Sequence, residues 1–179
     1  LELKLLSDVG LVGLPNSGKS TLISVVSNSK PKIADYPFTT LIPNLGVVKF
    51  DENFEFVMSD IPGLIKNAHL GAGLGINFLK HIERTKIICH CVDVGHISIE
   101  NPTEDFEIVR NELKAFNPEI LQKEYIVVLT KTDLVEKDKI LEIESKFRNY
   151  SFPIFSISAV AQSGIQPLIK YLGSTCKKV

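Results

Sequence analysis

Residues 13–20 read Gly13-Leu14-Pro15-Asn16-Ser17-Gly18-Lys19-Ser20 and fit the pattern G-x-x-x-x-G-K-[ST] at every fixed position. The two glycines allow the backbone to curl and to point its N–H groups at phosphate oxygens. In this pattern Lys19 reaches the β- and γ-phosphates, and the Ser20 hydroxyl binds Mg²⁺. The stretch therefore predicts a nucleoside triphosphate site formed by Gly13, Leu14, Pro15, Asn16, Ser17, Gly18, Lys19, Ser20 and Thr21.

The residues on either side of this loop predict a strand followed by a helix. An apolar run, Val9–Val12, precedes the loop, and Leu22, Val25 and Val26 follow it with helical spacing. This order directs the N-terminus of the helix at the anion. The context distinguishes the loop from a chance glycine-rich turn.

Strand and helix patterns alternate along the rest of the chain, which indicates an α/β fold. Apolar stripes with helical spacing occur at 106–116, 140–147 and 165–172, and we expect all three to face the core. Only Asp51-Glu52-Asn53 joins the second and third strands, which must therefore form an antiparallel hairpin. We predict a six-stranded, mostly parallel sheet with one antiparallel strand, flanked by helices; its strands are Val9–Val12, Leu45–Phe50, Phe54–Ser59, Ile87–Val94, Tyr125–Leu129 and Pro153–Ile157.

The composition is typical of one globular domain. The chain has 179 residues, 44% of them hydrophobic, and a formal net charge of −1 that favours neither nucleic acid nor a membrane as a partner. No apolar run approaches the roughly 20 residues that span a bilayer, and no signal peptide is visible. Because the chain begins at Leu1 and its only methionine is Met58, we expect a fragment or an excised domain.

The three cysteines, Cys89, Cys91 and Cys176, have no spacing that indicates a disulfide framework. Cys89 and Cys91 lie two apart in a predicted strand and should share one face. A metal pair is conceivable, but no matching Cys or His pair occurs elsewhere. We interpret all three as small core residues in a reducing cytosol.

A second motif, Asp60-Ile61-Pro62-Gly63, follows the third predicted strand. A carboxylate in this place reaches Mg²⁺, usually through water, and the Gly63 N–H can approach the γ-phosphate. Asp-x-x-Gly is common in ordinary turns and gains its meaning here from the phosphate loop upstream. We therefore predict that Asp60, Ile61, Pro62 and Gly63 border the γ-phosphate.

A third motif, Thr130-Lys131-Thr132-Asp133, follows the apolar strand at 125–129 and predicts the base. Asp133 can accept hydrogen bonds from guanine N1–H and from the exocyclic amine, whereas adenine lacks both donors in that arrangement. A carboxylate that stays unpaired with the wrong base discriminates strongly. The aliphatic stem of Lys131 can lie against the base, so guanine is the expected base.

A fourth motif, Ser156-Ile157-Ser158-Ala159, lies at the end of the last predicted strand, and we count Ser158, Ala159 and the following Val160 among the binding residues. The Ala159 N–H is placed to bind guanine O6, and Ser158 can support Asp133. All four motifs follow strands of the predicted sheet. They should therefore converge at the carboxyl ends of the strands, where α/β folds bind ligands.

Two long segments, Lys30–Asn44 and Asp60–Gly75, fit no regular element. Connections of this length in a compact domain are typically functional or mobile. The run Gly71-x-Gly73-x-Gly75 resembles a dinucleotide fingerprint, but no strand leads into it and residue 76 is Ile76. We discount that interpretation.

Four longer runs are more specific than the short motifs: KPKIADYPFTTLIPNLGVV at residues 30–48, DIPGLI at 60–65, AHLG at 68–71 and HIERT at 81–85. In these runs the chain resembles the G domain of the Obg family of translation-factor-type GTPases, and the resemblance extends nearly from end to end. The resemblance implies a Ras-like P-loop NTPase fold and one G domain over residues 1–179. It also leads us to expect that a glycine-rich N-terminal domain and any C-terminal domain are absent from this fragment.

The resemblance further implies roles for the two long segments as switch I (30–44) and switch II (60–75). Thr40 becomes a Mg²⁺ ligand beside Ser20 and Asp60. It implies that GTP or GDP binds with Mg²⁺. It also implies a cytoplasmic GTP/GDP switch in assembly of the large ribosomal subunit, with rRNA contact by the full-length protein. We expect the domain to be monomeric. The residues that the resemblance places along the nucleotide are Phe38, Thr39, Thr40, Leu41 and Ile42.

Several residues depart from the family pattern. Thr130 stands where most members have Asn, which bridges the phosphate loop and the base, so nucleotide affinity should be lower. Lys66-Asn67 replaces a more usual acidic-glycine pair. Leu64 occupies the place of the water-orienting glutamine of Ras-like proteins and cannot hydrogen-bond a water, so intrinsic hydrolysis should be slow.

Two residues are candidates to compensate for Leu64. Asn16 lies in the phosphate loop as it does in GTPases that use K⁺, and we hypothesise K⁺ stimulation. His69 in switch II is the alternative, as a residue that orients water. The expected catalytic residues are Lys19, Thr40, Gly63 and Asn16.

Three function classes remain open. The first is a slow GTPase of the Obg type. The second is a sensor that binds guanine nucleotide but scarcely hydrolyses GTP. Leu64 and Thr130 are the residues that motivate this hypothesis. The third is a P-loop kinase or ATPase, against which Asp133 argues.

Overall fold

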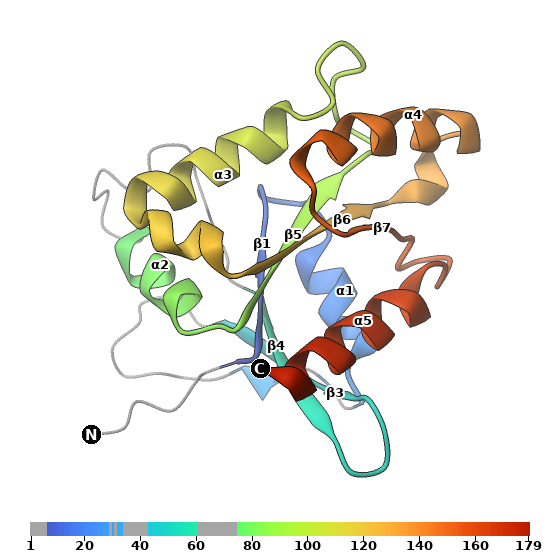
Figure 1. Cartoon of the computed structure of the whole chain (residues 1–179). Coiled ribbons are helices and arrows are strands. Elements are labelled where there is room, and N and C mark those ends of the chain that lie inside the picture. The colour runs from blue at the N-terminus through green and yellow to red at the C-terminus, as the bar shows by residue number, and fades with distance from the viewer. Residues whose placement is uncertain (1–6, 29, 31, 34–42, 61–74) are drawn as a thin grey trace.

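The strand that leads into the phosphate loop lies at the centre of the sheet (Figure 1). The computed structural model describes residues 7–28, 30, 32–33, 43–60 and 75–179. Strand β1 (Val9–Val12) is buried along its whole length and pairs in parallel with β4 (Glu55–Asp60) and β5 (Ile87–Asp93). The full order is β2-β3-β4-β1-β5-β6-β7, with the remaining strands β2 (Lys32–Ile33), β3 (Asn44–Lys49), β6 (Glu124–Thr130) and β7 (Ile154–Ser156).

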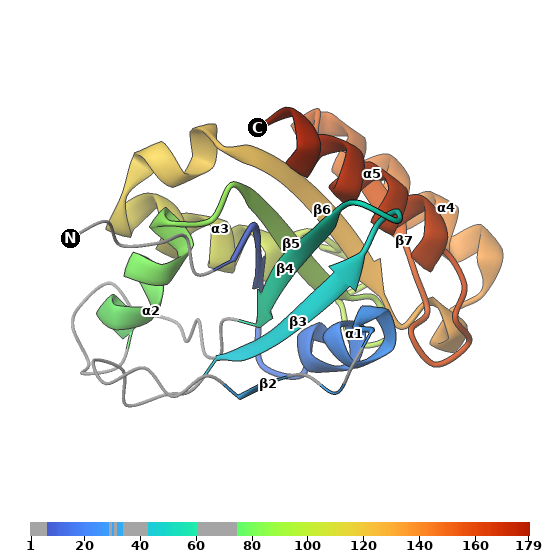
Figure 2. The same cartoon turned by 90° about the horizontal axis from the view of Figure 1, so that it is seen from below.

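All six predicted strands are present, and the antiparallel hairpin is confirmed. Strand β3 runs antiparallel to β4, with Val47 opposite Val57. The Asn53 N–H donates to Asp51 Oδ1 at 2.9 Å in the connecting turn. The seventh strand, β2, is a two-residue edge strand beside β3 (Figure 2), too short to leave an alternating pattern in the sequence.

Helices cover both faces of the sheet (Figures 1 and 2). One face carries α1 (Lys19–Val26) and α5 (Ile165–Lys178), and the other carries α2 (Gly75–Glu83), α3 (Glu104–Phe116) and α4 (Lys137–Phe147). Because successive strand residues point to opposite faces, Ile88 and Val92 of β5 join the cluster under α3. The three predicted apolar stripes face the core, with Phe106, Phe147 and Leu168 buried.

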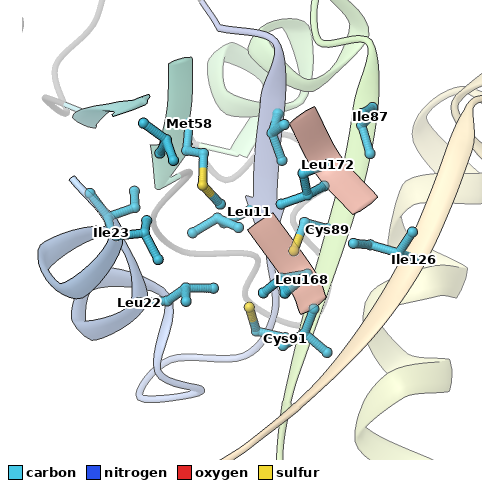
Figure 3. Packing of buried hydrophobic residues seen from close by; sticks show 14 of the residues in the cluster. Leu11, Leu22, Ile23, Met58, Ile87, Cys89, Cys91, Ile126, Leu168 and Leu172 are labelled. Atoms are coloured by element: carbon cyan, nitrogen blue, oxygen red, sulfur yellow. The ribbon is translucent and has the colours of Figure 1, made fainter. Parts of the chain in front are cut away.

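The cysteines belong to the core, as the sequence predicts. Cys89 and Cys91 of β5 and Cys176 of α5 are at most 3% exposed and belong to one apolar cluster. Figure 3 shows Cys89 and Cys91 within it. All three thiols are free. Burial raises the pKa of the Cys176 thiol to about 12, and a hydrogen bond with Cys91 together with burial raises the pKa of Cys89.

Neither a membrane-spanning helix nor a cluster of metal-ligating side chains occurs among the described residues. None of the helices in that part of the chain is both long and apolar enough to cross a membrane. Residues 7–28, 30, 32–33, 43–60 and 75–179 contain no group of three or more His, Cys, Asp or Glu side chains that is arranged to hold a metal ion.

His90 is a buried polar residue on the α3 side of β5. Its side chain is 1% exposed, its Nδ1 lies 2.7 Å from Tyr125 Oη, and its ring stacks on Phe106 at 4.8 Å. Burial lowers the pKa of His90 from 6.5 to about 3, and the positive charges of Lys19 and Arg110 add to the effect. The imidazole is therefore neutral in the folded protein at ordinary pH.

This histidine predicts a loss of stability in acid. Between pH 6.5 and about 3 the unfolded chain binds a proton at His90 and the folded chain does not. In that window we expect the free energy of unfolding to fall with pH by about 1.4 kcal/mol per unit from this residue. Urea unfolding across the window, compared with His90→Gln, measures the effect; equal slopes for the two proteins would contradict it.

Candidate functional site

The phosphate loop connects β1 to α1 and requires glycine at its two ends. Gly13 has φ 153° and Gly18 has φ 90°, a region that side chains rarely adopt. A Cβ at Gly13 would lie 2.5 Å from the Cys91 carbonyl oxygen of the neighbouring strand. Any larger residue at position 13 would therefore displace the loop from the end of β5.

Lys19 curls back over the phosphate loop from the first turn of α1. Its Nζ donates to the carbonyl oxygens of Gly13 at 3.2 Å and Leu14 at 2.9 Å, and to Ser17 Oγ at 3.3 Å. The side chain is buried, and this burial lowers the pKa of Lys19, while the carboxylate of Asp60 opposes the shift. The Lys19 ammonium thus lies inside a loop of backbone groups at the amino end of a helix.

A second polar pair lies where β4 ends beside this helix. The Ser20 hydroxyl donates to Asp60 Oδ2. Asp60 is 5% exposed, and its Oδ1 is buried with no hydrogen-bond partner among the described residues. Carboxylate and hydroxyl oxygens are the ligands that Mg²⁺ prefers, so an unpaired buried carboxylate oxygen beside a hydroxyl fits that ion.

A cavity of about 220 Å³ lies beside the phosphate loop, at the carboxyl end of β6. Asp133 stands in its wall, and Ser158 donates from Oγ to Asp133 Oδ1 at 2.6 Å. Ser158 is itself buried and accepts from the Ala161 N–H at 3.0 Å. The lining residues are Gly18, Thr21, Thr130, Lys131, Asp133, Leu134, Ile157, Ala159 and Val160.

Thr130 ties the cavity to the phosphate loop. Its Oγ1 donates to the Ser17 carbonyl oxygen at 2.7 Å and lies 3.2 Å from that of Val92. The side chain is 3% exposed. The hydroxyl therefore supplies a bridge to the loop, although it is shorter than the asparagine expected in this place.

The structure brings most of the predicted site residues together but does not cover all of them. The phosphate loop, Asp60, residues 130–133 and residues 158–160 meet at the carboxyl ends of the strands. Sequence reasoning missed Leu134, which lines the cavity, and Asp93, which contacts Lys131 at 2.5 Å. The following predicted or discussed residues lie outside the described part of the chain: Phe38, Thr39, Thr40, Leu41, Ile42, Ile61, Pro62, Gly63, Leu64, Lys66, Asn67 and His69.

The remaining histidines do not enter this site. His81 is buried in α2, and burial lowers its pKa. His96 is 76% exposed, and its Nδ1 lies 3.2 Å from Asp93 Oδ2. Neither lines the cavity that Asp133 borders. His96 instead lines a separate cavity with Asp93 and residues 14–17 of the phosphate loop.

Comparison with known sequences gives one consistent pattern. A family profile described as 50S ribosome-binding GTPase matches residues 8–131. The GTPase Obg of Thermodesulfovibrio yellowstonii is 54% identical over 179 residues, which are 99% of this chain and 53% of that protein. The GTPase Obg of Aquifex aeolicus is 50% identical over 169 residues, which are 94% of this chain and 49% of that protein. The chain spans about half the length of these curated relatives.

Comparison with solved structures agrees on the fold. Era from Aquifex aeolicus, crystallised as a variant bound to GDP·AlF4⁻, is similar with a TM-score of 0.69 and 25% identity, over 93% of this chain and 55% of that one. The G domain of the T. maritima FeoB iron transporter has a TM-score of 0.67 and 19% identity, over 94% of this chain and 97% of that one. At 19% identity the second likeness concerns the fold alone.

Proposed function

Because the chain belongs to the Obg family of P-loop GTPases, we propose that it binds guanine nucleotide with Mg²⁺ and hydrolyses GTP slowly to GDP. The observation that carries the proposal is the Asp133 carboxylate, fixed by Ser158 in the wall of a cavity that adjoins the phosphate loop. A base in this cavity would place its sugar and phosphates toward Gly18 and Lys19. A carboxylate there favours a base that presents two neighbouring donors, as guanine does.

Each part of the site has a proposed role in this reaction. The loop N–H groups and the Lys19 ammonium hold the phosphates, and Lys19 exchanges its loop carbonyls for phosphate oxygens. Ser20 and Asp60 would hold Mg²⁺, which neutralises phosphate charge when bound. From the segments outside the described residues, we propose that Thr40 and Gly63 approach the γ-phosphate. The Ala159 N–H is proposed to bind the base O6.

The sequence lacks a water-orienting side chain after the Asp-x-x-Gly motif, and this absence bears on the rate of hydrolysis. Leu64 replaces the residue that orients the attacking water in Ras-like proteins, and a leucine has no hydrogen-bonding group. Phosphoryl transfer passes through a charge-spread transition state that needs an extra cation or a positioned water. We propose that GTP turnover is slow for this reason. The protein then acts through its nucleotide-bound conformation rather than through the rate at which it forms GDP.

A monovalent cation at the phosphate loop is the proposed compensation. Asn16 is exposed on the loop at φ 64°, and its amide oxygen is a suitable ligand for K⁺. We expect GTP turnover about tenfold faster in KCl than in NaCl at equal ionic strength, because a fixed cation stabilises developing phosphate charge. Asn16→Gly keeps the positive φ without strain and should lose the difference; equal wild-type rates in both salts would refute the idea.

The proposed activity is tested by single-turnover hydrolysis of GTP, with ATP as competitor. Release of phosphate on a timescale of minutes to hours supports a slow GTPase, whereas tight binding without release favours the sensor that Leu64 and Thr130 suggest. ATP that competes as well as GTP would support a kinase or ATPase instead. These outcomes separate the three classes left open by the sequence.

For the full-length protein we propose a cytoplasmic switch in assembly of the large ribosomal subunit, through contacts that include rRNA. The support is the family match, since the matching family is described as 50S ribosome-binding GTPase. We also propose that residues 1–179 form one monomeric G domain. Cosedimentation of the full-length protein with 50S subunits in GTP, and its release in GDP, is the expected result.

A further inference from the structure

Two successive residues at the carboxyl end of β6 hold two successive peptides of the phosphate loop. Thr130 Oγ1 donates to the Ser17 carbonyl oxygen at 2.7 Å, and Lys131 Nζ donates to the Asn16 carbonyl oxygen at 2.8 Å. These contacts join positions more than one hundred residues apart, since the paired residues differ by 113 and 115 in sequence number. The segment that lines the base cavity is thus fastened directly to the phosphate loop.

Strand β5 supports both donors from the other side. Asp93 pairs with Thr130 in the register of the two parallel strands, which brings the Asp93 side chain to the level of Lys131. Asp93 Oδ2 accepts from Lys131 Nζ at 2.5 Å, and Oδ1 accepts from the Gly95 N–H at 2.9 Å. The carboxylate is therefore held by its own loop and aimed at the ammonium.

This ion pair is partly shielded from solvent. The Asp93 side chain is 13% exposed and the Lys131 side chain 32% exposed. At a reduced local dielectric the attraction between two charges increases, and screening by salt declines. The competing partner, His96, approaches Asp93 from solvent at the longer distance of 3.2 Å.

The backbone at both ends of the Lys131–Asn16 contact is strained. Lys131 has φ 58° and Asn16 has φ 64°, in the left-handed region that costs free energy for residues with a side chain. Such conformations persist where the surrounding contacts hold them. Here the ammonium, fixed between the Asp93 carboxylate and the Asn16 carbonyl, is the contact that joins the two strained residues.

We propose that Asp93 is a positioning residue for nucleotide binding and acts only through Lys131. Its carboxylate holds the ammonium against Asn16, which keeps the Lys131 stem along the base cavity and keeps the phosphate loop in its curled conformation. Asp93 is not among the residues that line the base cavity. The proposal rests on the proposed guanine-nucleotide binding and assigns a further residue to it.

A double-mutant cycle on nucleotide affinity tests this proposal. We would measure the Kd of fluorescently labelled GDP for the wild type, Asp93→Asn, Lys131→Met and the double variant. Each single variant should weaken binding about tenfold, the effect of one hydrogen bond to a charged group. The double variant should bind no more weakly than Lys131→Met, because Asp93 has lost the residue through which it acts. Multiplied effects would overturn the proposal.

Two further variants keep the test decisive. His96→Ala removes the other side chain on the same carboxylate and should leave the Kd unchanged; a tenfold loss would contradict a role through Lys131. Asp93→Glu keeps the charge but displaces it, and it should bind with intermediate affinity and have no effect in the Lys131→Met background. Thermal unfolding of every variant identifies any that fails to fold. If Asp93→Asn does not fold, the cycle is completed with Asp93→Glu in its place.

The failure of this proposal is distinguishable from failure of the proposed function. A wild-type chain that does not bind labelled GDP, or binds labelled ADP equally well, refutes guanine specificity itself. A wild-type chain that binds GDP selectively, with independent effects of Asp93 and Lys131, refutes only the positioning role.

Discussion

Asp133→Asn is expected to weaken GTP binding by at least about 100-fold. The carboxylate accepts two hydrogen bonds from the guanine edge in the proposed complex, and hydrogen bonds to charged groups are worth about 1.5–3 kcal/mol each. The asparagine amide presents a donor to the donors of guanine. Ser158 donates to Oδ1 of Asp133 at 2.6 Å, and this contact can persist with the amide oxygen, so the new N–H group faces the base.

The same substitution should improve binding of xanthosine triphosphate. Xanthine carries a carbonyl oxygen where guanine carries its exocyclic amine, and that oxygen accepts from the asparagine amide. Competition of GTP, XTP and ATP against labelled GDP measures the change. Asp138→Asn, at the exposed start of α4, removes the same charge nearby and serves as the control. Unchanged GTP affinity in Asp133→Asn would exclude this carboxylate from the base site.

Lys19→Met is expected to lower the single-turnover rate of GTP hydrolysis by about 10²–10³-fold, the usual cost of removing one preorganised donor from a transition state. Lys19 is 6% exposed, so its attraction for phosphate is poorly screened by solvent. Its three hydrogen bonds show that the ammonium already lies within the loop. Methionine has a similar length and leaves little empty volume, so the fold should persist.

The matched control for this variant is Lys123→Met. Lys123 is also partly buried, and burial lowers its pKa as it does for Lys19. Its Nζ donates to the carbonyls of Glu83 at 2.8 Å and Thr85 at 2.6 Å, near the amino end of β5 and away from the phosphate loop. We expect this variant to lose stability but to keep its hydrolysis rate per folded molecule. A comparable rate loss in both lysine variants would remove Lys19 from catalysis.

The main features of the fold could be predicted because local patterns determine them. The strand at 87–93 and the stripe at 106–116 are recognisable from apolar periodicity alone, and the turn at Asp51 is too short for a crossover. The convergence of the four motifs then follows from the geometry of parallel strands. Strand β2 has no such pattern, because two residues on an edge form too few contacts to constrain their sequence.

The contacts between motifs could not be predicted in the same way. Nothing near Asp93 in the sequence indicates that its partner is Lys131, because the pairing depends on the order and register of β5 and β6. A carboxylate directly after an apolar strand was the available signal. Thr130 is a related case: the sequence shows the substitution, but only the fold shows its hydroxyl against the Ser17 carbonyl.

The three buried thiols allow unfolding of this domain to be followed by the rate of thiol labelling. Cys89 and Cys91 lie in a central strand, whereas Cys176 lies in the last turn of α5, a helix on one face of the sheet. A thiol reagent can modify Cys176 when α5 dissociates locally from the sheet. It can modify Cys89 and Cys91 only when the sheet itself unfolds. The labelling rate of Cys176 therefore reports fraying of α5, and the labelling rate of Cys89 and Cys91 reports global unfolding. A ligand that stabilises only the phosphate loop should slow labelling of Cys89 and Cys91 more than labelling of Cys176.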